Sequence, residues 1–189
     1  MMLTIASVAS FPAQPWRNGR GMTRVIATGA DWRISLADIQ TDGPFSVFPG
    51  LTRSLLLAAG ARLTLHGLSP APQDLRALGQ SVCFKGEMPV SACCHGAPVQ
   101  ALNLMVRSEK AACLACFHGP VVLPAQARFC LLPLSGSWRI ETIQKPVSCG
   151  FVVDGASDER PICVSPDHGA PGCLMAVVFI ESKSLKDMS

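Results

Sequence analysis

Charged side chains are scarce in this chain of 189 residues, since 15% of its residues are charged and 49% are hydrophobic. A chain this apolar can bury a large core and is not expected to be disordered. It has no run of basic residues and a net charge of only +3, which argues against a nucleic-acid partner. The apolar run from Cys173 to Ile180 is far shorter than a membrane span. Met1 to Pro12 has no basic region, so we expect no secretory signal and a cytoplasmic, membrane-free protein.

The motifs of familiar catalytic sites are also missing. The chain contains no Gly-x-Ser-x-Gly nucleophile elbow and no Gly-x-x-x-x-Gly-Lys phosphate loop. Asp38 and Asp42 could form a carboxylate pair for acid–base chemistry, but they flank a predicted turn and we interpret them as turn residues. The sequence therefore favours a protein that is not an enzyme.

Histidine is equally sparse, and the four histidines include no His-x-His pair: His66, His95, His118 and His168. A metal site needs three or four nitrogen, oxygen or sulfur donors that converge on one cation. His95 and His168 belong to a repeated turn motif, which indicates a structural role for both. We predict no metal and no other cofactor.

Nine cysteines are scattered through apolar stretches of the chain. Cys113 and Cys116 lie three residues apart in a predicted strand, so strand alternation directs them to opposite faces. No second Cys-x-x-Cys is present to complete a zinc site, and no βαβ pattern suggests a redox centre. We interpret the cysteines as buried packing residues.

What the chain does have is a series of short strands, punctuated by fifteen prolines and sixteen glycines. Asp31 to Asp38 alternates strictly, with its tryptophan, isoleucine and leucine on one face and Arg33, Ser35 and Ala37 on the other. The apolar run Arg53–Ala59 and the alternating segment Arg62–His66 predict a hairpin around Gly60. The one helix we predict is short, near Gln73–Leu78.

An internal repeat fixes the expected architecture. The letters His-Gly-Ala-Pro occur at His95–Pro98 and again at His168–Pro171, each followed by an apolar strand. The spacing of Arg53 and Gly60 recurs approximately in Arg128 and Gly136. Two halves of similar plan, roughly residues 20–108 and 109–182, predict an all-β protein of two packed antiparallel barrels or jelly rolls with few short helices.

Four sequence blocks, in this order, carry a resemblance to a known family. They are Trp16–Arg24 (WRNGRGMTR), Asp31–Asp38 (DWRISLAD), Gly43–Arg53 (GPFSVFPGLTR) and Leu102–Arg107 (LNLMVR). Together they resemble the HutD/Ves family of the cupin superfamily, and they cover most of residues 15–107.

The resemblance implies a bicupin, with an N-terminal cupin-like barrel in residues 1–108 and a C-terminal one in residues 109–189. Members of the family are tied to histidine utilisation in some bacteria and to stress response in others. Catalytic cupins hold a metal with two closely spaced histidines, a carboxylate and a later histidine, a set that this chain lacks. Arg20 stands where the family usually has glycine, and Ala101 where it often has an acid.

Several polar residues of these blocks lie on the same face of a predicted strand: Arg33 shares a face with Ser35, and Asn103 shares a face with Met105. In a barrel, such a face can point into the interior. Buried arginine needs a partner, and the chain has only thirteen acids, so a small anion is the expected ligand. The candidate ligand-binding residues are Arg17, Asn18, Thr23, Arg24, Arg33, Ser35, Ser46, Arg53, Asn103 and Arg107.

The ligand hypothesis is a small carboxylate, held by Arg24, Arg33 and Arg107 and oriented by Asn18 and Asn103. The family context suggests a histidine-degradation intermediate such as urocanate or formiminoglutamate, bound to govern pathway flux. The alternatives are a cupin-type enzyme acting on a similar acid, and a structural or regulatory protein, in which the arginines pair with Asp31, Asp38 and Asp42. Monomer and homodimer both stay open.

Overall fold

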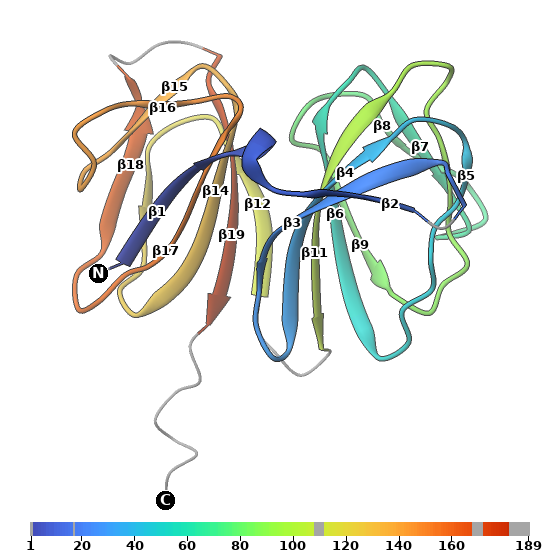
Figure 1. Cartoon of the computed structure of the whole chain (residues 1–189), viewed down its shortest axis with the longest axis horizontal. Coiled ribbons are helices and arrows are strands. Elements are labelled where there is room, and N and C mark those ends of the chain that lie inside the picture. The colour runs from blue at the N-terminus through green and yellow to red at the C-terminus, as the bar shows by residue number, and fades with distance from the viewer. Residues whose placement is uncertain (1, 17, 108–111, 168–171, 182–189) are drawn as a thin grey trace, which may run out of the picture. The chain divides into compact units, whose positions relative to one another are not determined.

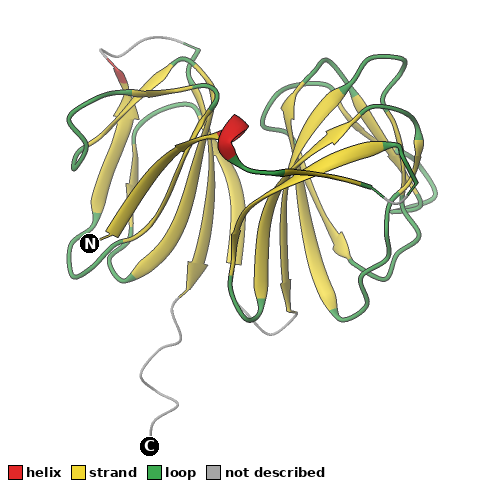
Figure 2. Ribbon diagram, viewed as in Figure 1, coloured by secondary structure: helices red, strands yellow, loops and turns green. Residues whose placement is uncertain are grey.

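A computed structural model describes residues 2–16, 18–107, 112–167 and 172–181 of the chain. The described residues form strands and loops with no α-helix, and a short 3₁₀ helix, η1 (Val8–Ser10), follows the first strand (Figure 2). The predicted all-β class is therefore confirmed. No helix in the described part of the chain is long and apolar enough to cross a membrane.

The chain divides into two compact units, and the N-terminal unit spans residues 9–109. Its strands form two antiparallel sheets (Figure 1). The larger sheet has the order β2 (Ala13–Pro15), β3 (Gly21–Thr28), β4 (Trp32–Ile39), β11 (Val99–Arg107), β6 (Leu51–Ala59), β9 (Ser81–Lys85). The smaller sheet has the order β5 (Gly43–Pro44), β10 (Ser91–Cys93), β7 (Leu63–His66), β8 (Gln73–Leu75).

The C-terminal unit combines residues 110–189 with the first eight residues of the chain. Its larger sheet has the order β1 (Met2–Ser7), β17 (Phe151–Ala156), β14 (Ala127–Ser135), β19 (Leu174–Glu181), β12 (Ala112–Phe117). Its smaller sheet has the order β13 (Val121–Leu123), β18 (Ile162–Pro166), β15 (Ser137–Ile140), β16 (Val147–Ser148). The sequence-based boundary placed residues 1–8 in the N-terminal unit, whereas β1 pairs along its length with β17 of the C-terminal unit.

Strand order reveals the same plan in both units. Strands β4 to β11 correspond one to one with β12 to β19: β4-β11-β6-β9 matches β12-β19-β14-β17, and β5-β10-β7-β8 matches β13-β18-β15-β16. Gly60 follows β6 and Gly136 follows β14, and both have positive φ angles, 99° and 70°. The duplication is thus visible in the topology. The first His-Gly-Ala-Pro copy forms the turn before β11, and the second, residues 168–171, lies outside the described residues.

Each unit packs its two sheets over one apolar core. In the N-terminal unit, Leu55 and Leu57 of the larger sheet share a core with Leu63 and Leu65 of the smaller one. In the C-terminal unit, Trp138 is fully buried in the corresponding core. The sheets are not closed into barrels, so the jelly-roll alternative describes each unit better than the barrel.

Two local predictions are wrong. The segments on either side of Gly60 do not form a hairpin, because β6 pairs with β9 and β11 while β7 pairs with β8 and β10 of the other sheet. The pattern of an apolar run, a glycine and a second strand is compatible both with a hairpin and with a connection between two different sheets. The predicted helix near Gln73–Leu78 is instead strand β8 followed by a turn.

Candidate functional site

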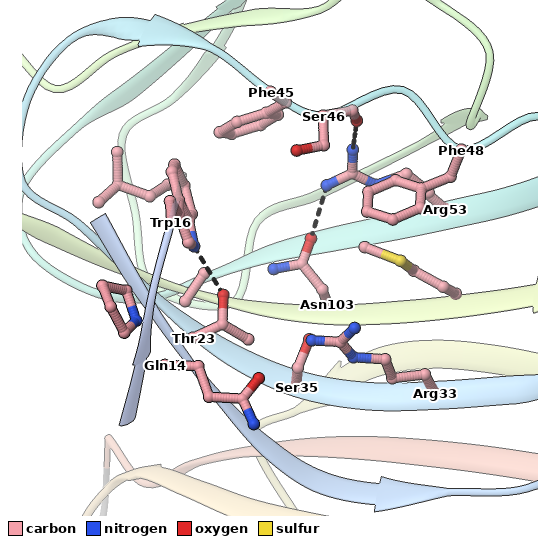
Figure 3. Close-up of a pocket in the computed structure, with 14 residues that line it drawn as sticks. Gln14, Trp16, Thr23, Arg33, Ser35, Phe45, Ser46, Phe48, Arg53 and Asn103 are labelled. Carbon is pink, nitrogen blue, oxygen red and sulfur yellow. Dashed lines mark hydrogen bonds between the residues drawn. The ribbon is translucent and has the colours of Figure 1, made fainter. Parts of the chain in front are cut away.

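A cavity of about 570 Å³ lies within the N-terminal unit, a volume typical of small-molecule sites (Figure 3). It lies against the core-facing side of the larger sheet and extends to the segments before β3 and β6. Its lining residues are Gln14, Pro15, Trp16, Thr23, Arg33, Ser35, Ala37, Ile39, Phe45, Ser46, Phe48, Arg53, Asn103 and Met105.

Strand register arranges the floor of this cavity in rows. Met105 on β11 lies between Arg33 on β4 and Arg53 on β6. Asn103 lies beside Ser35 in the next row, and both side chains are buried. Because side chains of a strand alternate between faces, residues two apart on β4 and β11 project into the same cavity. The sequence-predicted face of Arg33, Ser35 and Ala37 is therefore confirmed as a shared face.

Arg53 occupies a position on β6 where the next inward residues, Leu55 and Leu57, belong to the core. It is 5% exposed, and burial lowers the pKa of its guanidinium to about 10, so that it stays charged at pH 7. Its Nη2 donates to Oδ1 of Asn103 at 3.2 Å and its Nη1 to the main-chain oxygen of Ser46 at 3.3 Å. No carboxylate among the described residues pairs with it.

Three phenyl rings surround the Arg53 guanidinium. Its Cζ lies 5.1 Å from the ring centroid of Phe84, 5.3 Å from that of Phe45 and 5.4 Å from that of Phe48. Such contacts stabilise a cation when water is excluded. The rings hold the charge in place without neutralising it.

Arg33 is the second cation of the cavity. Within the described part of the chain, its guanidinium has no hydrogen-bond or ion-pair partner, and its Nε is buried. The cavity lining includes no aspartate, glutamate, histidine, lysine or cysteine. Two arginines with no acid beside them give the cavity a net positive charge, which favours an anion.

Trp16 and Phe45, one of the rings over Arg53, form an aromatic part of the cavity wall (Figure 3). The rings of Trp16 and Phe45 meet edge to face, with centroids 5.9 Å apart and planes at 87°. Trp16 Nε1 donates to Oγ1 of Thr23 at 2.7 Å, and the main-chain N of Trp16 donates to Gly21 O at 2.9 Å. These bonds fix the indole against strand β3.

The polar segment between Trp16 and β3 is tied to the turn before β5. Arg20 donates to the main-chain oxygen of Asp42, and Asn18 Nδ2 donates to Pro44 O at 3.4 Å. Oδ1 of Asn18 also accepts from the Arg20 main-chain N at 3.0 Å. Arg20 therefore helps to hold this segment in place and does not line the cavity.

Six of the ten sequence-predicted site residues line the cavity: Thr23, Arg33, Ser35, Ser46, Arg53 and Asn103. Arg24 points to the other face of β3 and forms an ion pair with Asp38, whose Oδ1 also accepts from Gln100 Nε2 at 2.6 Å. Arg24 cannot contact a ligand there, because Thr23 is the residue of that pair that faces the cavity.

Two further predicted residues also lie outside this cavity. Asn18 is in the exposed turn just described. Arg107 Nε lies 3.2 Å from Oδ1 of Asp31, and both residues line a smaller adjoining cavity of about 280 Å³. Arg17 lies outside the described residues. The structural alternative, in which the arginines pair with nearby aspartates, therefore holds for Arg24 with Asp38 and for Arg107 with Asp31. Among the described residues, Arg33 and Arg53 have no such partner.

The sequence reasoning missed Gln14, Trp16, Phe45 and Phe48 as lining residues. A signal was available for the two phenylalanines, which flank Ser46 in the block Gly43–Arg53. The tryptophan opens the block Trp16–Arg24.

The donors needed for a cupin-type metal are absent from the cavity lining, so these residues do not fit such an ion. No group of three or more His, Cys, Asp or Glu side chains in the described ranges is placed to hold a metal. His95 instead has Nε2 at 2.7 Å from Oγ1 of Thr64, in the turn before β11, in agreement with its predicted structural role.

All nine cysteines are free thiols. Cys94, Cys130 and Cys173 are buried as predicted for packing residues, but Cys83, Cys113, Cys149 and Cys163 are exposed. The packing interpretation is therefore wrong for these four.

The interpretation of Asp38 as a turn residue is also wrong, because Asp38 belongs to strand β4.

The duplicated sheets and the polar cavity define a bicupin with an acid-free, arginine-lined pocket in its N-terminal unit. The HutD family profile matches residues 8–148, and the chain belongs to this family. The solved structure of HutD from Pseudomonas fluorescens SBW25 superposes with a TM-score of 0.79 at 21% identity, covering 96% of this chain and all of that one.

The chain is also similar in sequence to curated proteins. Protein Ves of Citrobacter koseri is 33% identical over 110 residues, 54% of this chain and 57% of that protein. An uncharacterized 21.2 kDa protein encoded in the hutC 3′ region of Pseudomonas putida is 32% identical over 119 residues, 57% of this chain and 60% of that protein. The chain thus matches less than two thirds of the length of these two relatives.

Proposed function

We propose that the N-terminal unit binds a small carboxylate through Arg33 and Arg53 and that the protein has a regulatory rather than a catalytic role. The observation that carries this proposal is Arg53, a charged guanidinium, 5% exposed, in a cavity whose lining has no acid. A buried cation without a counterion is unfavourable, and an anionic ligand removes that penalty.

The chemistry of the cavity supports a carboxylate in particular. Arginine presents planar donors that match the two oxygens of a carboxylate. Hydroxyl groups of Ser35 and Ser46 lie in the same lining and offer further donors. Oδ1 of Asn103 accepts a hydrogen bond from Arg53, and its Nδ2 donates to the main-chain oxygen of Ala101. Asn103 therefore orients the arginine.

The family connection suggests the class of pathway. The Pseudomonas putida relative is encoded beside hutC, and the Pseudomonas fluorescens structure is of HutD in a formate condition. Urocanate and formiminoglutamate, carboxylates of histidine degradation, are therefore the ligands to test first. Occupancy of the cavity would report their concentration and limit flux through the pathway.

Titration calorimetry with these two compounds tests the proposal. We expect saturable binding to the wild-type protein and a loss of at least tenfold in affinity in Arg53→Met, which keeps side-chain bulk and removes the charge. Arg24→Met is the matched control, because Arg24 is paired with Asp38 outside the cavity. Absence of heat at millimolar ligand with folded protein, or equal affinity in Arg53→Met, would contradict the proposal.

A further inference from the structure

Met105 lies between the two arginines of the cavity. On β11 it pairs with Arg33 of β4 on one side and with Arg53 of β6 on the other. Residues directly opposite each other in an antiparallel sheet project to the same face, with Cβ atoms about 4.5–5.5 Å apart. The Met105 side chain is 7% exposed and lines both the main cavity and the smaller adjoining one. A small solute in either cavity therefore meets the thioether beside two cations.

The C-terminal unit shows that the fold itself does not require this row. Its strands β14 and β19 pair as β6 and β11 do, and each pair has a register shift close to the turn glycine that follows β6 or β14. Arg53 and Phe129 both lie seven residues before that glycine. The row of the C-terminal unit that corresponds to Arg33, Met105 and Arg53 is therefore Cys113, Phe179 and Phe129. A thioether between two guanidinium groups is thus a property of the N-terminal cavity.

The chemistry that these three side chains favour is oxidation of the sulfur. A lone pair of a thioether attacks one oxygen of a hydroperoxide, so that the S–O bond forms while the O–O bond breaks. The sulfur gives up two electrons, and the proton of the attacked oxygen passes to the leaving oxygen, which departs as water or an alcohol. Negative charge develops on the leaving oxygen, and preorganised cationic donors stabilise it. Arg33 and Arg53 each have a buried Nε without a hydrogen-bond partner among the described residues.

The product of this oxidation competes with an anionic ligand. Oxidation turns a flexible apolar side chain into a polar one whose sulfoxide oxygen accepts hydrogen bonds. That oxygen would lie between Arg33 and Arg53, neither of which has a carboxylate partner in the described part of the chain. It can therefore take the guanidinium donors that a carboxylate needs.

We propose that Met105 is a site of reversible oxidation by hydroperoxides and that its sulfoxide closes the cavity to carboxylates. The closure rests on the proposed function, whereas the oxidation of Met105 does not. Two thiols restore the thioether in an enzyme-catalysed step that gives a disulfide and water. The protein then binds its ligand only in the reduced state.

Mass spectrometry of peptides after timed exposure to hydrogen peroxide tests the oxidation site. Met88 is partly exposed and Met175 is 0% exposed, so accessibility alone predicts that Met88 reacts first. We expect the wild-type protein to oxidise Met105 at least as fast as Met88, while Met175 stays reduced. Arg33→Leu should slow the oxidation of Met105 at least threefold and leave Met88 unchanged. Slower oxidation of Met105 than of Met88 in the wild-type protein would overturn the proposal.

Calorimetry with urocanate tests the closure of the cavity. We expect peroxide treatment to weaken binding to the wild-type protein at least tenfold, and treatment with both epimer-specific methionine sulfoxide reductases to restore it. Met105→Leu, a substitution that nearly conserves volume, is the matched control. Its nine thiols and its other methionines meet the same reagent, yet its affinity should stay within twofold.

The outcomes separate the two proposals. Unchanged affinity in a wild-type protein whose Met105 is oxidised would overturn the closure, and so would an equal loss of affinity in peroxide-treated Met105→Leu. If the untreated wild-type protein binds neither urocanate nor formiminoglutamate, the proposed function fails. The peptide measurement then still decides whether Met105 is an oxidation site.

Discussion

Arg53 and Asn103 are joined by a hydrogen bond of 3.2 Å from Nη2 to Oδ1, across the neighbouring strands β6 and β11. The amide accepts from the guanidinium and leaves its positive charge uncompensated. An asparagine here orients the cation, whereas an aspartate would neutralise it. The charge of residue 103 thus determines whether the Arg53 guanidinium remains available to bind an anion.

We therefore predict that Asn103→Asp abolishes carboxylate binding without harming the fold. The new carboxylate would form an internal ion pair with Arg53, and a ligand would have to displace it. Affinity should fall at least tenfold, about 1.4 kcal/mol. Calorimetry and thermal melting measure the two effects. Asn103→Ala, which adds no charge, should lower the melting temperature and weaken binding less; an Asn103→Asp protein with wild-type affinity contradicts this account.

Arg53 should contribute to binding and not to stability. A buried charge without a counterion is costly to the folded state, so we expect Arg53→Met to be at least as stable as the wild-type apo protein. Chemical denaturation in the absence and presence of ligand measures this, and only the wild-type protein should gain stability from the carboxylate. A loss of more than about 2 kcal/mol in apo Arg53→Met would show that the phenyl rings and Arg53 form a structural cluster.

Much of the fold follows from local patterns in the sequence. Strict alternation at Asp31–Asp38 predicts both the strand and the common face of Arg33 and Ser35. The recurrence of Gly60 as Gly136 indicates the duplication. The pairing of β1 with β17 was not predictable, because a short apolar strand fits the edge of either unit.

The site was predicted less completely. Thr23 and Arg24 are adjacent in one strand and must face opposite sides, yet both were included as ligand residues. Which one lines the cavity depends on the side of the sheet that the core covers, and that is a tertiary property. The aromatic wall of Trp16 and Phe45 comes from loops whose path over the sheet leaves no periodic signal.

Gly60 should tolerate substitution worse than an ordinary turn glycine. Its φ of 99° disfavours any side chain, and a Cβ there would lie 2.6 Å from Cγ1 of Val99 at the start of β11. Gly96, with φ 78° and open space around it, supplies the control. We expect Gly96→Ala to lose about 1–2 kcal/mol and Gly60→Ala at least about 1 kcal/mol more. Equal losses in denaturant unfolding would refute the steric argument.

Stability at acid pH should depend on Asp74. Arg62 and Arg76 each donate to its Oδ2 at 2.7 Å, and Thr64 donates to Oδ1 at 2.9 Å. The hydrogen bonds from Arg62 are the main cause that holds the pKa of the Asp74 carboxyl well below its usual range, and those from Thr64 and Arg76 lower it further. A lowered folded-state pKa means that the stabilisation is complete above the unfolded pKa and is lost as the pH falls through the folded pKa.

Asp74→Asn should accordingly be less stable than wild type at pH 6. The difference in stability between the two proteins should begin to shrink below about pH 4, near the ordinary aspartate pKa. It should approach zero once Asp74 is protonated in the folded wild-type protein. Urea midpoints measured from pH 7 to pH 2 give both curves. A difference that stays constant over this range would mean that the ionisation of Asp74 is not what stabilises the protein.

The arginine side chains themselves provide the most direct measurement. The Nε atoms of Arg24, Arg33 and Arg53 are all buried and have no hydrogen-bond partner in the described part of the protein. Their Nε–Hε resonances can be followed by NMR during a titration with urocanate or acetate. The account predicts saturable shifts for Arg33 and Arg53 and none for Arg24; shifts at Arg24 alone, or unchanged resonances at Arg33 and Arg53, would contradict it.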